Sequence, residues 1–221
     1  MPDFYLIPGM GADQRLYTHF DLPGEMHKLN WWPHGKAKSL AEYAAILAEQ
    51  IKTTDNVIIG SSMGGMVASE LSHLIKPRAT ILVSAPTGRH QFPAVLKFFD
   101  GLRIHKVLTP GAVMRISSLA DLFMGFKTKE QRALFYDMLK GNGPEFLHFS
   151  IDTVLGWKNI QEPFGPYIQI IGSKDKLFKK SRIPHAVFLD GGGHFAAYEM
   201  GREVSAVIRD FLEKQTVEPA H

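Results

Sequence analysis

The most informative stretch of the sequence is Val57-Ile58-Ile59-Gly60-Ser61-Ser62-Met63-Gly64. Its apolar, β-branched start is typical of a buried strand. We predict that a helix follows from Gly64 to about Ile75, because Pro77 cannot continue it. Ser62 then lies in the turn between strand and helix, with a glycine two positions away on either side. Glycine relieves crowding where a chain turns this sharply, so the stretch predicts a tight turn that presents Ser62 above a strand end.

Outward from this stretch, short apolar runs alternate with helical patterns. Strands are predicted at Phe4–Ile7, Met26–Trp32, Val57–Ile59, Thr80–Val83, Tyr167–Ile171 and Ala186–Leu189. Helices are predicted at Asp13–Phe20, Leu40–Ile51, Gly64–Ile75 and Ala197–Lys214, with Ser39 and Glu42 forming a capping box before the second. Apolar strands separated by helices indicate an α/β fold with a compact parallel sheet of about six strands, covered by helices on both faces.

The alternation stops between residues 86 and 165, which contain no convincing strand. Four helical stretches are predicted there, at Ala94–Leu108, Gly111–Phe123, Lys129–Leu139 and Pro144–Leu155. An insertion of this length is too long for a simple loop. We therefore expect residues 1–85 and 166–221 to form the core and residues 86–165 to form a helical cap.

Composition and charge limit the classes of partner that we expect for this protein. The 221 residues are 45% hydrophobic and 21% charged, as in ordinary globular proteins, and include no cysteine for disulfides or thiolate chemistry. The formal net charge of +3 is too small to suggest a nucleic-acid partner. Neither a signal peptide nor a membrane span is evident, so we expect a cytoplasmic protein. The densest basic run, residues 174–182, is either a solvated loop or a positive rim that attracts anionic substrates.

Ser62 needs a base to become a nucleophile, and position selects one among the ten histidines. His194 follows three glycines in the loop between the last strand and the last helix. The three glycines let the backbone bend His194 over the sheet edge toward Ser62. His73 and His148 are predicted to pack or face solvent. Residues 60–64 match the pattern Gly-x-Ser-x-Gly, in which Ser62 is the serine and Ser61 only the x before it, so Ser61 is a weaker nucleophile candidate.

The histidine in turn needs a carboxylate that fixes its tautomer. Asp175 ends the segment Gly172-Ser173-Lys174-Asp175, directly after the fifth predicted strand. Asp190 lies on the strand that leads to His194 and would have to turn back, while Asp152 lies in the expected cap. The sequence therefore predicts Ser62, Asp175 and His194 as a catalytic triad.

An oxyanion hole is expected beside this triad. The loop Pro8–Gly11 follows the first strand, and its two glycines let the backbone approach a bound carbonyl. The expected donors are the backbone N–H groups of Met10 and Met63. No dinucleotide fingerprint, P-loop or metal-ligand spacing is present, so we expect neither a cofactor nor a metal.

With these residues placed, the chain resembles the α/β-hydrolase superfamily over residues 3–85 and 166–214. The order Ser62, Asp175, His194 is the chain order of that superfamily. Many members have two further strands ahead of the strand that leads to the oxyanion loop. Their absence here leaves a sheet edge that must be short, charged or paired, which keeps a homo-oligomer open.

The resemblance implies a serine hydrolase, and branches that attack with aspartate are disfavoured by Ser62. The aliphatic and aromatic cap suggests a small to medium, mostly apolar carboxylic ester as the small-molecule substrate. Two alternatives stay open. One is a non-hydrolytic enzyme with the same triad, such as a hydroxynitrile-lyase-like lyase, and the other is a ligand-binding protein on a hydrolase fold.

Overall fold

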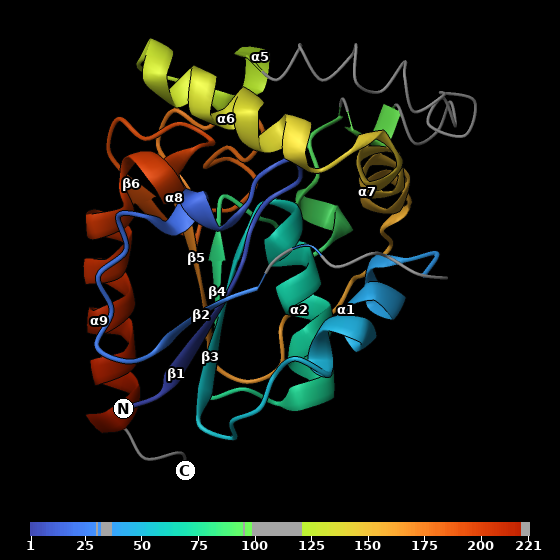
Figure 1. Ribbon diagram of the computed structural model, residues 1–221. Helices are drawn as coiled ribbons and strands as arrows, with labels where there is room; N and C mark the ends of the chain where they lie inside the picture. Colours follow the sequence, from blue (N-terminus) through green and yellow to red (C-terminus); the bar gives the residue numbers. More distant parts are fainter. Residues whose placement is uncertain (30, 32–36, 95, 99–120, 218–221) are drawn as a thin grey trace.

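The computed structural model describes residues 1–29, 31, 37–94, 96–98 and 121–217 (Figure 1). Its strands are β1 (Asp3–Ile7), β2 (Met26–Lys28), β3 (Asn56–Ser61), β4 (Ala79–Val83), β5 (Tyr167–Gly172) and β6 (Val187–Leu189). Its α-helices are α1 (Leu40–Ala48), α2 (Met63–Ile75), α5 (Asp121–Met124), α6 (Lys129–Gly141), α7 (Pro144–Gly156), α8 (Ala196–Glu199) and α9 (Gly201–Val217). Two short 3-10 helices are η1 (Gln14–Tyr17) and η2 (Arg89–Gln91).

The strands form one sheet in the order β2-β1-β3-β4-β5-β6, and every neighbouring pair is parallel. The predicted α/β fold with a parallel sheet is therefore confirmed, and the order shows that the chain starts near one edge. Parallel pairing sends the carboxyl ends of all these strands to the same edge of the sheet. The turn with Ser62 and the loops after β1, β5 and β6 all begin at that edge.

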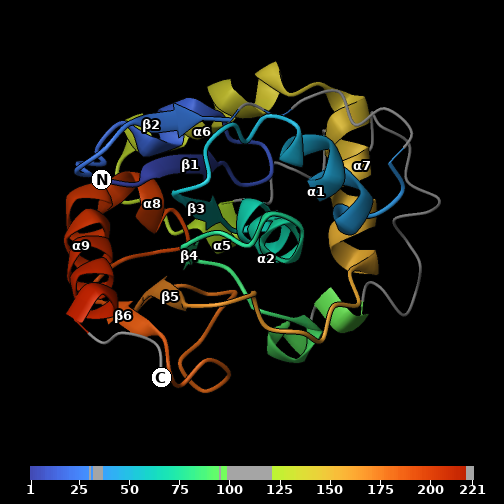
Figure 2. The ribbon, with the colours of Figure 1, turned by 90° about the horizontal axis from the view of Figure 1, so that it is seen from below.

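Helices cover both faces of the sheet (Figure 2). Alternate strand residues such as Leu6 and Ile59 pack in a core with α9, whereas Tyr5 and Ile58 pack in a second core with α1 and α2. This alternation is the pleat of a strand, which points successive side chains to opposite faces. Both faces are apolar, so the sheet is fixed in position between two helical layers.

Several predicted helices differ from the observed ones. The stretch Asp13–Phe20 forms only the 3-10 turn η1, with Asp13 as its N-cap. The last helix is broken into α8 and α9 at Met200, whose φ of −129° and ψ of 33° are not helical. Gly201 then begins α9 against His19, where an added Cβ would come within 2.9 Å. Glu42 does not complete the capping box, since it accepts the N–H of Lys38 rather than that of Ser39.

The segment between β4 and β5 carries helices and no strand in its described part. Helices α6 and α7 match two of the predicted stretches, and Figure 1 shows α5 and α6 beyond the carboxyl ends of the strands. The predicted helices Ala94–Leu108 and Gly111–Phe123 lie mostly outside the described residues. No helix in the described ranges is long and apolar enough to cross a membrane.

Candidate active site

The turn between β3 and α2 forces Ser62 into an unusual backbone conformation. Its φ of 52° and ψ of −118° lie in a region that residues with a side chain rarely adopt. The flanking glycines show why the turn closes so tightly. A Cβ at Gly60 would lie 2.2 Å from the carbonyl oxygen of Gly64, and one at Gly64 would lie 2.2 Å from that of Pro8. The predicted sharp turn is therefore present, and only glycine fits at both positions.

The structure brings the side chains of Ser62, His194 and Asp175 into one hydrogen-bonded chain. His194 Nε2 lies 3.0 Å from Ser62 Oγ, and His194 Nδ1 lies 2.8 Å from Asp175 Oδ2. The carboxylate can only accept, so Nδ1–H donates to Asp175 and leaves Nε2 free to accept the serine proton. His194 and Asp175 are both buried, with 4% of their surface exposed.

Asp175 is held as a carboxylate. Its second oxygen, Oδ1, accepts the backbone N–H groups of Leu177 and Phe178 at 2.8 and 3.0 Å. Burial by itself raises the pKa of Asp175, but the contact with His194 and the two N–H donors outweigh it and hold that pKa below its ordinary value. The competing acid Asp190 is exposed and accepts from Ser173 instead.

The loop Pro8–Gly11 lies directly beside the serine. A Cβ at Gly9 would lie 3.3 Å from the Cβ of Ser62, so a larger residue would crowd this contact. The carbonyl oxygen of Gly9 accepts Ala12 N–H at 3.0 Å and Trp31 Nε1–H at 3.1 Å. In a planar trans peptide the next N–H points the opposite way. These two donors therefore fix the direction of the Met10 N–H.

Met63 is the first residue of α2, where backbone N–H groups lack a partner within the helix. Its N–H therefore belongs to the positive end of the helix whose N-cap is Ser62. The sequence predicted Met10 and Met63 as donors but not the role of Trp31, because the hydrogen bond from Trp31 to Gly9 joins two separate loops. The only sequence signal for Trp31 was an aromatic residue near the end of a predicted strand.

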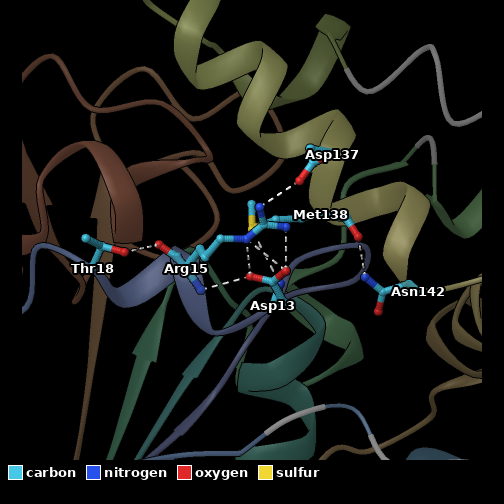
Figure 3. A network of polar contacts seen from close by, with 6 residues as sticks. All are labelled: Asp13, Arg15, Thr18, Asp137, Met138 and Asn142. Atoms are coloured by element: carbon cyan, nitrogen blue, oxygen red, sulfur yellow. Dashed lines mark hydrogen bonds and ion pairs between the residues drawn. The ribbon is translucent and has the colours of Figure 1, made fainter.

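Helix α6 holds the segment that follows this loop. Figure 3 shows Arg15 on η1 bridging two carboxylates, with Asp137 of α6 2.6 Å from Nη1 and Asp13 2.8 Å from Nη2. Gly11 also lies against α6, since a Cβ there would meet Leu139 at 2.4 Å. The expected cap is thus in direct contact with the loop that carries Met10.

One group with metal-ligand geometry is found in the described ranges, formed by Asp3, Glu25 and His27. It lies at the amino ends of β1 and β2, the opposite end of the sheet from Ser62. The two carboxylates approach opposite nitrogens of His27, with Asp3 at 3.8 Å and Glu25 at 3.9 Å. This group has no part in the candidate site.

Comparisons with known proteins identify a family and several similar structures. The model of the alpha/beta hydrolase family matches residues 2–207. An N-acyl homoserine lactonase, AidH, has a TM-score of 0.71 at 16% identity, covering 100% of this chain and 92% of its own. A thermophilic esterase has a TM-score of 0.68 at 22% identity, covering 96% and 89%. A lipase-esterase related protein from Clostridium acetobutylicum has a TM-score of 0.63 at 14% identity, covering 95% and 94%.

No curated protein matches the sequence. At these identities the similar structures establish the architecture, and the family model, which spans nearly the whole chain, establishes the membership. The chain belongs to the alpha/beta hydrolase family.

Proposed function

We propose that the protein is a serine hydrolase that cleaves a small to medium, mostly apolar carboxylic ester through an acyl-enzyme. The observation that carries this proposal is the continuous chain from Asp175 through His194 to Ser62, with contacts of 2.8 and 3.0 Å. A serine without such a base is a weak nucleophile. Here the base is within hydrogen-bond reach and is itself oriented by a buried carboxylate.

In the proposed reaction, Ser62 Oγ attacks the ester carbonyl while His194 Nε2 takes the serine proton. The backbone N–H groups of Met10 and Met63 stabilise the oxyanion of the tetrahedral intermediate. Protonated His194 then gives the proton to the departing alcohol, which leaves an acyl group on Ser62. His194 next activates a water molecule that releases the acid, and no step needs a metal or a cofactor.

The proposed substrate class follows from the surroundings of the site. We propose that residues 86–165 form a cap, and its described helix α6 contributes apolar side chains to the core next to the Met10 loop. Met10 itself packs against both cores. An apolar acyl or alcohol group suits such surroundings. The similar structures include an esterase, a lipase-esterase related protein and a lactonase, which all point to an ester bond.

Turnover of p-nitrophenyl esters from acetate to octanoate tests this proposal. We expect wild type to hydrolyse them, with the preferred chain length reporting the size of the acyl pocket. Ser62→Ala should abolish turnover. Ser61→Ala is the matched control and should retain turnover, because Ser61 is buried as well but is not part of the hydrogen-bonded chain from Asp175 through His194 to Ser62. Equal activity of wild type and Ser62→Ala would refute the proposal.

A further inference from the structure

Glu199, at the end of α8, is a carboxylate that the proposed mechanism does not use. Its side chain is only 1% exposed. Its Oε1 accepts the backbone N–H of Gly193 at 2.6 Å. Its Oε2 accepts no hydrogen bond from the described residues but has the Nζ of Lys127 as counter-ion at 3.2 Å. A charge this deeply buried is costly unless it is paired, so the contacts of Glu199 need a structural or functional explanation.

The contacts of Glu199 converge on the residue before His194. Gly193 is tightly enclosed, since a Cβ there would lie 2.9 Å from the carbonyl oxygen of Met124 and 3.3 Å from Glu199 Oε1. On the other side of His194, the N–H of Phe195 donates to the same Met124 carbonyl at 3.2 Å. The backbone is therefore held on both sides of His194 by hydrogen bonds that involve neither Ser62 nor Asp175.

We propose that Glu199 is a positioning residue for His194, and that Lys127 is the counter-ion of Glu199 in that role. This positioning role rests on the proposed function, in which His194 acts as the base. Lys127 precedes α6, so the charge that stabilises the histidine loop comes from the expected cap. A displacement of about 1 Å at a reacting group can reduce a rate roughly a hundredfold, so an anchor beside the base affects kcat more than substrate binding.

Three variants separate positioning from general stability. Glu199→Ala removes the acceptor for Gly193, whereas Glu199→Gln keeps an oxygen that can accept it. Glu70→Ala is the matched control, because Glu70 accepts a hydrogen bond from Trp157 at 2.7 Å and has no contact with the histidine loop in the described structure. Each is measured for kcat and KM on a p-nitrophenyl ester and for thermal stability.

We expect Glu199→Ala to lower kcat by roughly 10- to 100-fold with KM nearly unchanged. Glu199→Gln should recover kcat to within about threefold of wild type, since the Gly193 hydrogen bond is retained. Glu70→Ala should lower the melting temperature and leave kcat unchanged. Lys127→Met should lower kcat in wild type but not in the Glu199→Gln background, because the charge it pairs with is then absent. Full kcat in Glu199→Ala would overturn the proposal.

A second readout does not depend on ester turnover. The proton on His194 Nδ1, which is hydrogen-bonded to Asp175, is expected to give a far-downfield proton NMR signal, and His194→Ala would assign it. Glu199→Ala should broaden or remove this signal, and Glu199→Gln should keep it. An unchanged signal in Glu199→Ala would overturn the positioning role. A wild type that shows the signal but has no esterase activity would instead refute the proposed function alone.

Discussion

Ser62→Gly should make the protein inactive and more stable than Ser62→Ala. Both variants lose the hydroxyl group, so both lose the proposed nucleophile. They differ in the Cβ atom, which alanine keeps and glycine lacks. Because Ser62 has a φ of 52°, the Cβ is strained in the native turn, and only glycine removes that strain.

The size of the effect follows from two opposing terms. A residue in a sparsely populated backbone region costs about 1–3 kcal/mol of native-state stability. Glycine in place of alanine lowers the free energy of unfolding by about 0.4–1 kcal/mol, because the unfolded chain is more flexible with glycine. The net gain is then roughly 0.5–2 kcal/mol. For a domain of this size, about 1 kcal/mol corresponds to roughly 2–4 °C, so we expect a difference of roughly 1–8 °C in melting temperature.

Differential scanning calorimetry on wild type and both variants measures this difference. Urea unfolding gives the same comparison at one temperature, and equal m-values would show that the unfolded states are alike. A Ser62→Gly variant no more stable than Ser62→Ala would refute the claim that the turn stores strain at Ser62.

Three further predictions concern the acid, the glycines and the basic loop. Asp175 has a lowered pKa in the folded protein, so its stabilising effect is present above its unfolded value near 3.8 and is lost as the pH falls through the lower folded value. The urea midpoints of wild type and Asp175→Asn should therefore converge as the pH falls below 3.8, and a gap that stays constant down to the lowest pH at which both fold would contradict this. Gly64→Ala places a Cβ 2.2 Å from a backbone carbonyl and should lower kcat/KM at least roughly 100-fold by shifting the oxyanion loop, whereas Gly141→Ala, where the space is open, should have wild-type activity. The exposed Lys174 and Lys176 flank the buried acid, so changing both to alanine should raise KM for a negatively charged ester more than for a neutral one, and equal effects would exclude a positive rim.

Local patterns were enough to predict the parallel sheet and the turn at Ser62. Strand residues such as Val57–Ile59 are apolar on both faces, and the glycines around Ser62 are needed for steric reasons that act within a few residues. The chain order of Ser62, Asp175 and His194 placed all three at one edge of the sheet, and the structure brings their side chains into contact.

Contacts between distant segments could not be read from the sequence. Gly201 packs closely against His19, and the direction of the Met10 N–H depends on Trp31. The ion pair between Glu199 and Lys127 joins residues that lie 72 positions apart in the sequence. Such effects depend on how finished elements pack, so no local pattern reveals them.

The most direct test of the account is covalent labelling with a fluorophosphonate, read by intact mass. An activated serine attacks this reagent and gains a single, stable adduct. We predict one adduct on wild type, mapped by peptide mass to Ser62, and none on Ser62→Ala. A folded wild-type protein that does not react, or a Ser62→Ala variant that still reacts, would contradict the assignment of Ser62 as the nucleophile.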